Sequence, residues 1–262
     1  MDLLHAARAA ASRAAELLRQ VEVPSASEWE AKSARDYVTD VDRRIEVAIA
    51  ELLEDMVPGM AIVGEELQPE LARGGRSWVV DPLDGTTNFL HRFPPWSVSI
   101  AAVEEGRPVA GVVVDVEREH EYSAALGQGA WRDGERLQVS TIAEPAQALI
   151  GTGFPFKDLG GLDAYMERFR RVAAATAGIR RAGSAAMDLC WVASGRFDAF
   201  WEQKLAPWDV AAGMLMVREA GGLVTDPSGR DLGVEHGPLV AGNPALHAWL
   251  LEILEQDRDG GG

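Results

Sequence analysis

The sequence predicts a mixed α/β fold whose first half is α+β and whose second half is α/β. The chain has 262 residues, 47% of them hydrophobic and 25% charged, which is the composition of a globular protein with a sizeable core. Two segments with helical periodicity precede several short apolar runs that are separated by turn residues. From about residue 145, apolar runs of strand length alternate with runs of helix length.

The first half begins with two predicted helices, 1–20 and 42–56. In the second helix, apolar side chains recur at spacings of three and four residues, as packing against a core requires. Four later segments have the apolar content of strands or hairpins: 61–64, 77–80, 97–116 and 121–140. The third contains a turn at Glu105-Gly106, and the fourth contains Asp133-Gly134, a dipeptide typical of tight hairpins. We therefore expect helices followed by a mostly antiparallel sheet.

In the second half, strands and helices are expected to alternate. The predicted strands are 148–154, 197–202, 223–226 and 238–242. The predicted helices are 163–177, 184–194, 209–222 and 244–256. No repeat, linker or low-complexity segment separates the two halves. We therefore expect two subdomains, 1–144 and 145–262, that pack tightly against each other.

The charge balance excludes several classes of partner. Lysine and arginine number 25 against 41 aspartates and glutamates, for a formal net charge of −16. This charge repels nucleic-acid phosphates and anionic lipids, so neither direct nucleic-acid binding nor a membrane is expected. The Ala-rich first 20 residues are broken by charged side chains, unlike a signal or a membrane span. The single cysteine, Cys190, excludes an intrachain disulfide and fits a reducing cytoplasm.

The chemically richest segment is residues 78–89, where an apolar strand runs into two carboxylates, Asp81 and Asp84. A proline between them and Gly85 after them fix an irregular backbone, so the carboxylates can converge on one point with the carbonyl oxygen of Leu83. Hard oxygen ligands of this kind suit Mg²⁺ or Mn²⁺. For an isolated Asp-x-x-Asp-Gly, an Asx-type turn followed by a helix cap is the alternative interpretation.

Two distant acidic residues favour the metal interpretation. Glu65 follows the predicted strand 61–64, and Asp209 opens the predicted helix 209–222. Taken singly, Glu65 can be a solvated loop residue and Asp209 an N-cap. Taken together with the aspartate pair, they present four carboxylates that cannot share a pocket without cations. Such cations would also attract a phosphorylated substrate that the net charge alone repels.

Three motifs in this order resemble the inositol monophosphatase family of Mg²⁺-dependent, lithium-sensitive phosphatases. They are GEE at 64–66, DPLDGTTNFLHRFPPWSVSIA at 81–101 and WDVAAG at 208–213. The likeness extends over nearly the whole chain and includes the segments 38–42, 179–190 and 219–222. It implies a layered αβαβα sandwich of the inositol monophosphatase and fructose-1,6-bisphosphatase type, in a cytoplasmic homodimer.

The resemblance also implies a metal site with two to three Mg²⁺ ions, for which Mn²⁺ can substitute. Glu65, Asp81 and the Leu83 carbonyl would hold one ion, and Asp81, Asp84 and Asp209 a second. A third, weaker ion would lie near Glu65. The loops of the first subdomain would thus supply most of the metal site, and the second subdomain would complete it. The chemistry would be metal-assisted hydrolysis of a phosphate ester.

By the same resemblance, Glu65 and Thr86 would polarise the nucleophilic water, with Asp42 supporting Thr86. The alternative role of Asp42 is a cap at the start of its helix, and Thr39 or Asp40 can serve in its place. The implied substrate contacts are Leu83, Asp84, Gly85, Thr86, Gly183, Ser184, Ala185, Glu202 and Asp209.

Two of these contacts have plain structural alternatives. Glu202 would accept hydrogen bonds from the hydroxyl groups of a polyol, but it can also be a surface charge at a strand end. Ser184 can be only the N-cap of the helix that follows it.

The function expected from the resemblance is hydrolysis of inositol 1-phosphate or a related small sugar or polyol phosphate. Within the same superfamily the alternatives are fructose-1,6-bisphosphatase, histidinol-phosphatase and 3′-phosphoadenosine 5′-phosphate phosphatase. An alternative of another class is a regulatory protein that acts in transcription complexes independently of catalysis. Every matched ligand position keeps its carboxylate, which favours catalysis.

Overall fold

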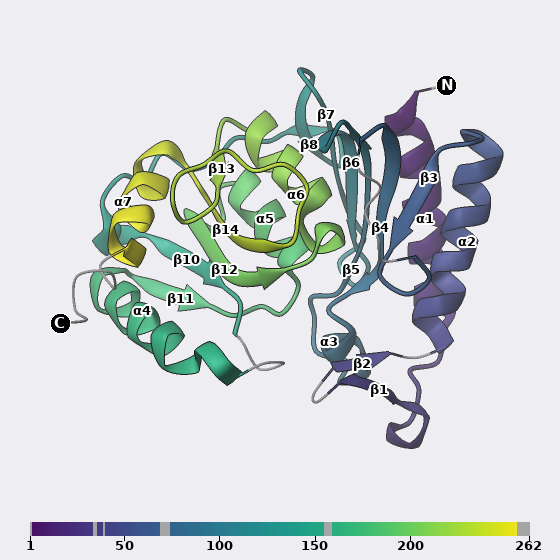
Figure 1. Cartoon of the computed structure of the whole chain (residues 1–262), viewed down its shortest axis with the longest axis horizontal. Helices are drawn as coiled ribbons and strands as arrows, with labels where there is room; N and C mark the ends of the chain where they lie inside the picture. The colour runs from purple at the N-terminus through teal and green to yellow at the C-terminus, as the bar shows by residue number, and fades with distance from the viewer. Residues whose placement is uncertain (1, 34–35, 39, 69–73, 155–158, 256–262) are drawn as a thin grey trace.

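The computed structural model describes residues 2–33, 36–38, 40–68, 74–154 and 159–255 (Figure 1). Helices and two sheets alternate in five layers, as the αβαβα expectation required. Helices α1 (Leu3–Gln20) and α2 (Asp40–Met56) cover one sheet. Helices α5 (Ala185–Ala193) and α6 (Pro207–Glu219) lie between the sheets. Helices α4 (Leu162–Ala175) and α7 (Pro244–Glu255) cover the other sheet.

The first sheet has seven strands in sequence order. They are β3 (Ala61–Gly64), β4 (Arg76–Asp84), β5 (Ser97–Glu104), β6 (Arg107–Asp115), β7 (His120–Ala125), β8 (Gly129–Arg132) and β9 (Glu135–Arg136). Among the described strands of this sheet, only β3 and β4 pair in parallel, so the mostly antiparallel sheet is confirmed. Strand β4 runs beyond the predicted 77–80, because its pairing with β5 resumes at Asp84 after a register shift that begins at Asp81.

The second sheet has the order β11-β10-β12-β14-β13. Its strands are β10 (Leu149–Thr152), β11 (Gly178–Arg180), β12 (Ala199–Leu205), β13 (Leu223–Thr225) and β14 (Gly237–Gly242). Strand β10 pairs in parallel with β11 and β12, whereas β14 is antiparallel to β12 and β13. The alternation of strand and helix therefore builds a mixed sheet.

The elements that the sequence analysis missed are short. Strand β11 has three residues, and so does β2 (Asp36–Val38), which pairs with β1 (Glu30–Ser33). The five-residue helix α3 (Thr86–Leu90) and the single turns η1 (Ala26–Glu28), η2 (Pro145–Gln147) and η3 (Leu159–Gly161) complete the described elements. Runs this short carry no detectable period.

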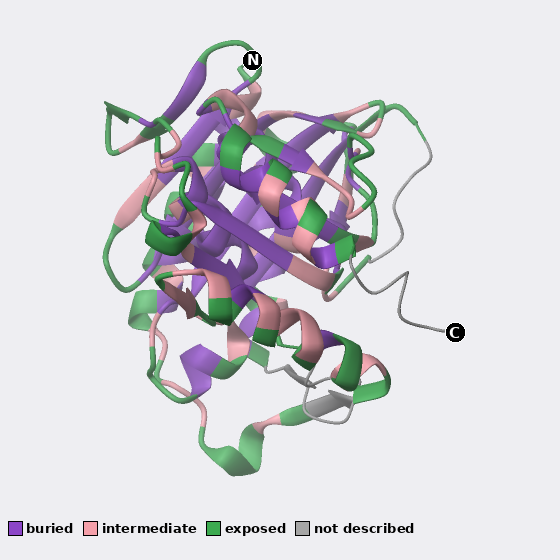
Figure 2. Ribbon diagram, turned by 90° about the vertical axis from the view of Figure 1, so that its left-hand side faces the viewer, coloured by how far each residue is buried: buried purple, intermediate pink, exposed green. Residues whose placement is uncertain are grey.

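The core forms three clusters: one between α1, α2 and the first sheet, one between the two sheets around α5 and α6, and one between the second sheet and α4 and α7. Figure 2 shows the strands buried while the covering helices keep exposed residues on their outer sides. The cluster between the sheets mixes residues of both predicted subdomains, for example Val63 and Val113 with Leu189 and Leu215. The division into 1–144 and 145–262 remains a prediction, since the two halves share this core. Among the described residues, no helix has the length and apolarity needed to cross a membrane.

Helix α2 begins at Asp40, two residues before the predicted start. Asp42 therefore lies inside the first helical turn, where it is only 1% exposed. Its predicted alternative role as the helix cap is wrong, because the helix has already started. Thr39, an alternative to Asp42 in the sequence analysis, lies outside the described residues, and so does the end of the chain from 256 to 262.

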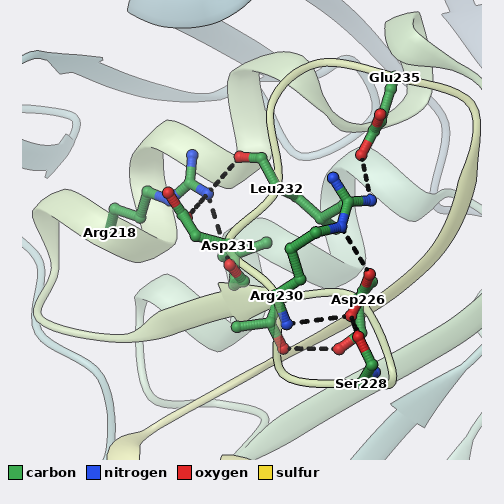
Figure 3. Close-up of polar contacts among 9 residues, drawn as sticks. Arg218, Asp226, Ser228, Arg230, Asp231, Leu232 and Glu235 are labelled. Carbon is green, nitrogen blue, oxygen red and sulfur yellow. Dashed lines mark hydrogen bonds and ion pairs between the residues drawn. The ribbon is translucent and has the colours of Figure 1, made fainter.

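A network of charged side chains fastens the loop between β13 and β14 to helix α6 (Figure 3). Arg218, in the last turn of α6, donates to Asp231 and to the carbonyl of Leu232, each at 2.7 Å. Arg230 donates to Asp226 at 3.0 Å and to Glu235 at 2.7 Å. This network holds the C-terminal end of α6, whereas Asp209 lies in its first turn.

Candidate active site

One pocket gathers every residue predicted to bind metal or substrate. The predicted residues that line it are Glu65, Asp81, Leu83, Asp84, Gly85, Thr86, Gly183, Ser184, Ala185, Glu202 and Asp209. They come from the ends of β3 and β4, from the starts of α3, α5 and α6, and from β12. Asp42 does not line the pocket, but its carboxylate accepts a hydrogen bond from the Thr86 hydroxyl.

Three of these carboxylates form a tight group. One carboxylate oxygen from each of Asp81, Asp84 and Asp209 lies within 4.8 Å of the others. The two residues from β4 converge because the Asp81 carboxylate accepts the backbone N–H of Leu83 at 2.9 Å, which bends the chain between them. Asp209 lies in the first turn of α6, where it accepts the backbone N–H of Ala206 at 2.7 Å. The group therefore joins strand β4 of the first sheet to helix α6.

Burial and repulsion from neighbouring carboxylates raise the pKa of all three carboxyl groups. Burial is the largest cause for each, and it brings the pKa of Asp84 to about 6. Burial, followed by repulsion from Glu65, Asp84 and Asp209, holds the pKa of Asp81 well above its usual range. Burial, followed by repulsion from Asp84 and Glu65, does the same to the pKa of Asp209. Such a group needs either protons or a cation, and its ligand atoms are all oxygens.

Asp84 is held in place by the start of α5. The hydroxyl of Ser184 donates to Asp84 Oδ2 at 2.6 Å, and the backbone N–H of Ala186 donates to the same oxygen at 2.8 Å. Ser184 also accepts the backbone N–H of Met187 at 3.3 Å, so it is the N-cap of α5 as well. Both interpretations of Ser184 are therefore compatible, because one hydroxyl donates and accepts.

Gly85 makes the sharp turn from β4 into α3. Its φ of 94° lies in the left-handed region. A Cβ at this position would lie 3.0 Å from the carbonyl oxygen of Pro95 and 3.2 Å from that of Gly183. Asn88 ties the same three segments together, since its side-chain amide donates to Pro95 at 2.7 Å and to Ala182 at 2.8 Å. The turn therefore packs closely against the backbone at Pro95 and Gly183.

We predict that Gly85→Ala lowers the free energy of unfolding by about 2 to 4 kcal/mol, from backbone strain and from the collision with two carbonyl groups. Gly127→Ala is the matched control, because Gly127 has a φ of 74° but open space around its Cβ position. Urea unfolding of both variants measures the difference. Equal losses would show that strain alone acts at Gly85 and that its tight surroundings do not matter.

The Thr86 hydroxyl faces two acceptors. It lies 3.2 Å from a carboxylate oxygen of Asp42 and 3.1 Å from the carbonyl oxygen of Leu83. A hydroxyl has one proton, so donation to either acceptor leaves its oxygen lone pairs for a further donor. Asp40, the alternative to Asp42, is exposed and lies near Arg43.

Glu65 and Glu202 line the pocket outside the group of three aspartates. Glu65 follows β3 directly, where Gly64 ends the strand. Glu202 lies in the middle of β12 and is half-buried. Its side chain packs directly against Gly153, because a Cβ on Gly153 would lie 1.8 Å from the Glu202 carboxyl carbon. The interpretation of Glu202 as a surface charge at a strand end is therefore wrong.

Sequence reasoning missed several pocket residues. The charged ones are Arg181, Asp188 and Lys204, and the others include Thr152, Phe154, Tyr165 and Gln203. Asp188 is 1% exposed, and burial, followed by repulsion from Glu202 and Asp84, holds its pKa well above the usual range. Asp188 follows Ser184 by four residues, so the two side chains lie on the same face of the helix. The helical period of the 179–190 segment was therefore the signal that could have placed Asp188 beside Ser184.

Comparisons with known proteins agree with this geometry. The sequence profile of the inositol monophosphatase family matches residues 2–258. The chain is 46% identical to the Nus factor SuhB of Pseudomonas aeruginosa over 96% of this chain and 94% of the relative. It is 42% identical to an inositol-1-monophosphatase of Rhizobium meliloti over 86% of this chain and 85% of the relative.

A solved structure gives the same result for the fold. The inositol monophosphatase from Anabaena (Nostoc) sp. PCC 7120 superposes with a TM-score of 0.83 at 33% identity, over 97% of this chain and 95% of that one. The match of the family profile over nearly the whole length agrees with this superposition. The chain therefore belongs to the inositol monophosphatase family.

Proposed function

We propose that the chain is a Mg²⁺-dependent phosphomonoesterase that hydrolyses inositol 1-phosphate, or a related small polyol phosphate, to the alcohol and inorganic phosphate. The observation that carries this proposal is the group of Asp81, Asp84 and Asp209, in which the first two are buried and one carboxylate oxygen of each lies within 4.8 Å of the others. Three carboxylates with raised pKa values in one pocket fit a divalent cation. Membership of the family supports the phosphatase chemistry.

In this proposal, Glu65, Asp81 and the Leu83 carbonyl hold one Mg²⁺, and Asp81, Asp84 and Asp209 hold another. A third, weaker ion near Glu65 belongs to the same proposal, and Mn²⁺ can substitute. When bound, the metal neutralises the carboxylates, lowers the pKa of a water and stabilises the leaving alkoxide.

The side chains around the metal site orient the water. Because Thr86 can donate its only proton to Asp42 or to the Leu83 carbonyl, its oxygen is available to accept a hydrogen bond from a water in the pocket. Glu65 lines the same pocket and can accept the hydrogen bond from the other O–H of the water, and then its proton when the water attacks the phosphorus. Asp42 thus acts through Thr86 by fixing the direction of its hydroxyl.

Two backbone segments are placed to bind the substrate. The amides of Gly85 and Thr86 stand at the start of α3, beside the group of aspartates, where they can donate to phosphate oxygens. Gly183, Ser184 and Ala185 line the same pocket. The substrate would lie against both segments, with its leaving group toward β12.

The leaving-group side of the pocket is lined by Glu202 and Asp188. Carboxylates accept hydrogen bonds from hydroxyl groups, so this wall fits a polyol. The same pocket is also lined by Phe154 and Tyr165, whose rings offer apolar surface. The polyol preference therefore rests mainly on Glu202.

We expect Glu202→Gln to raise KM for inositol 1-phosphate about tenfold, the effect of weakening a hydrogen bond to a charged group. The KM for p-nitrophenyl phosphate, whose leaving group offers no additional hydroxyl groups to Glu202, should change less than twofold. Steady-state kinetics on both substrates measures this split. A KM that rises equally for both substrates would place Glu202 outside the leaving-group site.

The proposal is tested by phosphate release from four substrates, with and without Mg²⁺. They are inositol 1-phosphate, fructose 1,6-bisphosphate, histidinol phosphate and 3′-phosphoadenosine 5′-phosphate. We expect Mg²⁺-dependent turnover with the highest kcat/KM for inositol 1-phosphate. A higher kcat/KM for one of the other three would reassign the substrate, and no turnover of any of them would remove the proposal.

A second candidate function is a regulatory role in transcription complexes, favoured by the name Nus factor that the Pseudomonas aeruginosa relative carries. The net charge of −16 makes a protein a better partner than RNA. The folded Asp84→Asn variant separates the two functions. A regulatory role predicts that this variant still binds transcription complexes as wild type does, after catalysis has been lost.

A further inference from the structure

Glu46 is a buried carboxylate of helix α2 that lies outside every motif discussed so far. It is 1% exposed. One of its oxygens accepts the backbone N–H of Glu66 at 2.8 Å, and the other accepts that of Leu67 at 3.0 Å. These two amides immediately follow Glu65. The Glu46 carboxylate therefore holds the turn that presents Glu65 to the pocket.

The Glu46 carboxylate also restricts which residue can stand at position 64, immediately before Glu65. A Cβ on Gly64 would lie 2.1 Å from Glu46 Oε1 and 2.5 Å from the Glu46 carboxyl carbon. Atoms cannot approach so closely, so residue 64 must be glycine as long as Glu46 keeps its position. Glu46 thus contacts the backbone on both sides of Glu65.

Asp42 lies one helical turn before Glu46, and residues four apart share a face of a helix. It is also 1% exposed, and it accepts the Thr86 hydroxyl at 3.2 Å. One face of α2 thus contacts both segments that are proposed to orient the water: Asp42 meets Thr86, and Glu46 meets the turn of Glu65. Four residues of helix rise about 6 Å, a spacing that intrahelical hydrogen bonds keep rigid.

We propose that helix α2 fixes the position of Glu65 relative to Thr86, and that Glu46 is the positioning residue for Glu65. Glu46 touches neither substrate nor metal; it acts through the backbone amides of Glu66 and Leu67. The inference rests on the proposed function, because Glu65 is proposed there as a metal ligand and as an acceptor for the water. It predicts that loosening Glu46 weakens metal binding at Glu65.

Two substitutions disturb this contact from opposite sides. Glu46→Gln keeps the size of the side chain but leaves one acceptor oxygen, and its NH₂ group meets the second backbone N–H. Gly64→Ala places a methyl group where the Glu46 carboxylate lies. Glu51→Gln is the control, because Glu51 lies on the same helix and is exposed. It removes the same charge without touching the turn.

The measurements need no turnover. Titration calorimetry of substrate-free protein gives the affinity for Mg²⁺, and hydrogen exchange of the metal-free protein reports on the amides of Glu66 and Leu67. We expect Glu46→Gln and Gly64→Ala each to weaken Mg²⁺ binding about tenfold, the usual effect of losing a residue that orients a ligand. Both should speed exchange at the two amides, and Glu51→Gln should do neither.

The double variant Glu46→Ala/Gly64→Ala tests whether both changes act through one contact. Once the carboxylate is gone, the added methyl group has nothing to collide with, so the double variant should bind Mg²⁺ no more weakly than Glu46→Ala alone. Additive losses would overturn the proposal. So would a Glu46→Gln protein with a lower melting temperature but unchanged Mg²⁺ affinity, since this is the result of a purely structural role.

Failure of the proposed function gives a different pattern. A wild-type protein that releases no phosphate, but whose Mg²⁺ affinity and amide exchange respond to Glu46→Gln as expected, would remove the phosphatase proposal. It would support the positioning role of Glu46 for the metal site.

Discussion

Asp84→Asn lowers kcat for phosphate release from inositol 1-phosphate by about a thousandfold, or roughly 4 kcal/mol of transition-state stabilisation. The reason is that Asp84 belongs to the group of three carboxylates in which a cation is proposed to bind. Asparagine can keep an oxygen where Ser184 and the Ala186 amide donate, so the loop geometry survives. The charge that binds the cation is lost. Rates at saturating Mg²⁺ measure this effect.

The matched control is Asp163→Asn, which removes an exposed aspartate from the first turn of α4. Its kcat should equal that of wild type. Circular dichroism should show the same secondary structure for both variants, so that a loss of folding is not mistaken for a loss of catalysis. An Asp84→Asn protein that keeps more than about a tenth of the activity would contradict the assignment of Asp84 as a metal ligand.

Without metal, Asp84→Asn is expected to raise the melting temperature at pH 8 by about 5 °C, because it removes one of three crowded negative charges. The folded-state pKa of Asp84, about 6, lies above its usual 3.8. A carboxyl group of this kind destabilises the fold fully above pH 6, and the penalty shrinks as pH falls toward 3.8. The advantage of the variant should therefore shrink between pH 6 and pH 4.

The same experiment with saturating Mg²⁺ is the control. The wild-type protein should then be the more stable one at pH 8, because the cation binds the folded state only. Thermal unfolding of both proteins at pH 8, 6 and 4.5 provides the data. A difference between wild type and variant that does not change with pH or with Mg²⁺ would show that the three carboxylates do not repel one another.

The local part of the site was predictable from the sequence. Asp81 and Asp84 stand close in the chain, and Gly85 has the conformation that its place after them required. Most helices and strands were predicted for a similar reason, since apolar periodicity is a local signal. The layering of the sheets and the approach of Asp209 to the aspartate pair came only from the family resemblance, because contacts between distant segments leave no period in a single sequence.

The buried carboxylates of helices were not predictable in the same way. Glu46 stands in an amphipathic helix whose pattern fits a solvated face as well as a buried polar contact, and Asp188 stands in an otherwise apolar helix, where the period shows its face but not its partner. Their partners, the turn after Glu65 and the leaving-group side of the pocket, are fixed only by tertiary structure. The strand β11 was missed for a simpler reason, since it has only three residues.

The most direct test of the central claim, that the aspartate group holds the catalytic cation, is a crystal grown with Mn²⁺ and measured at a wavelength where manganese scatters anomalously. The account predicts an anomalous peak between the carboxylates of Asp81, Asp84 and Asp209, which is absent in crystals of Asp84→Asn. A wild-type crystal of an active protein with no peak at these three residues would contradict it.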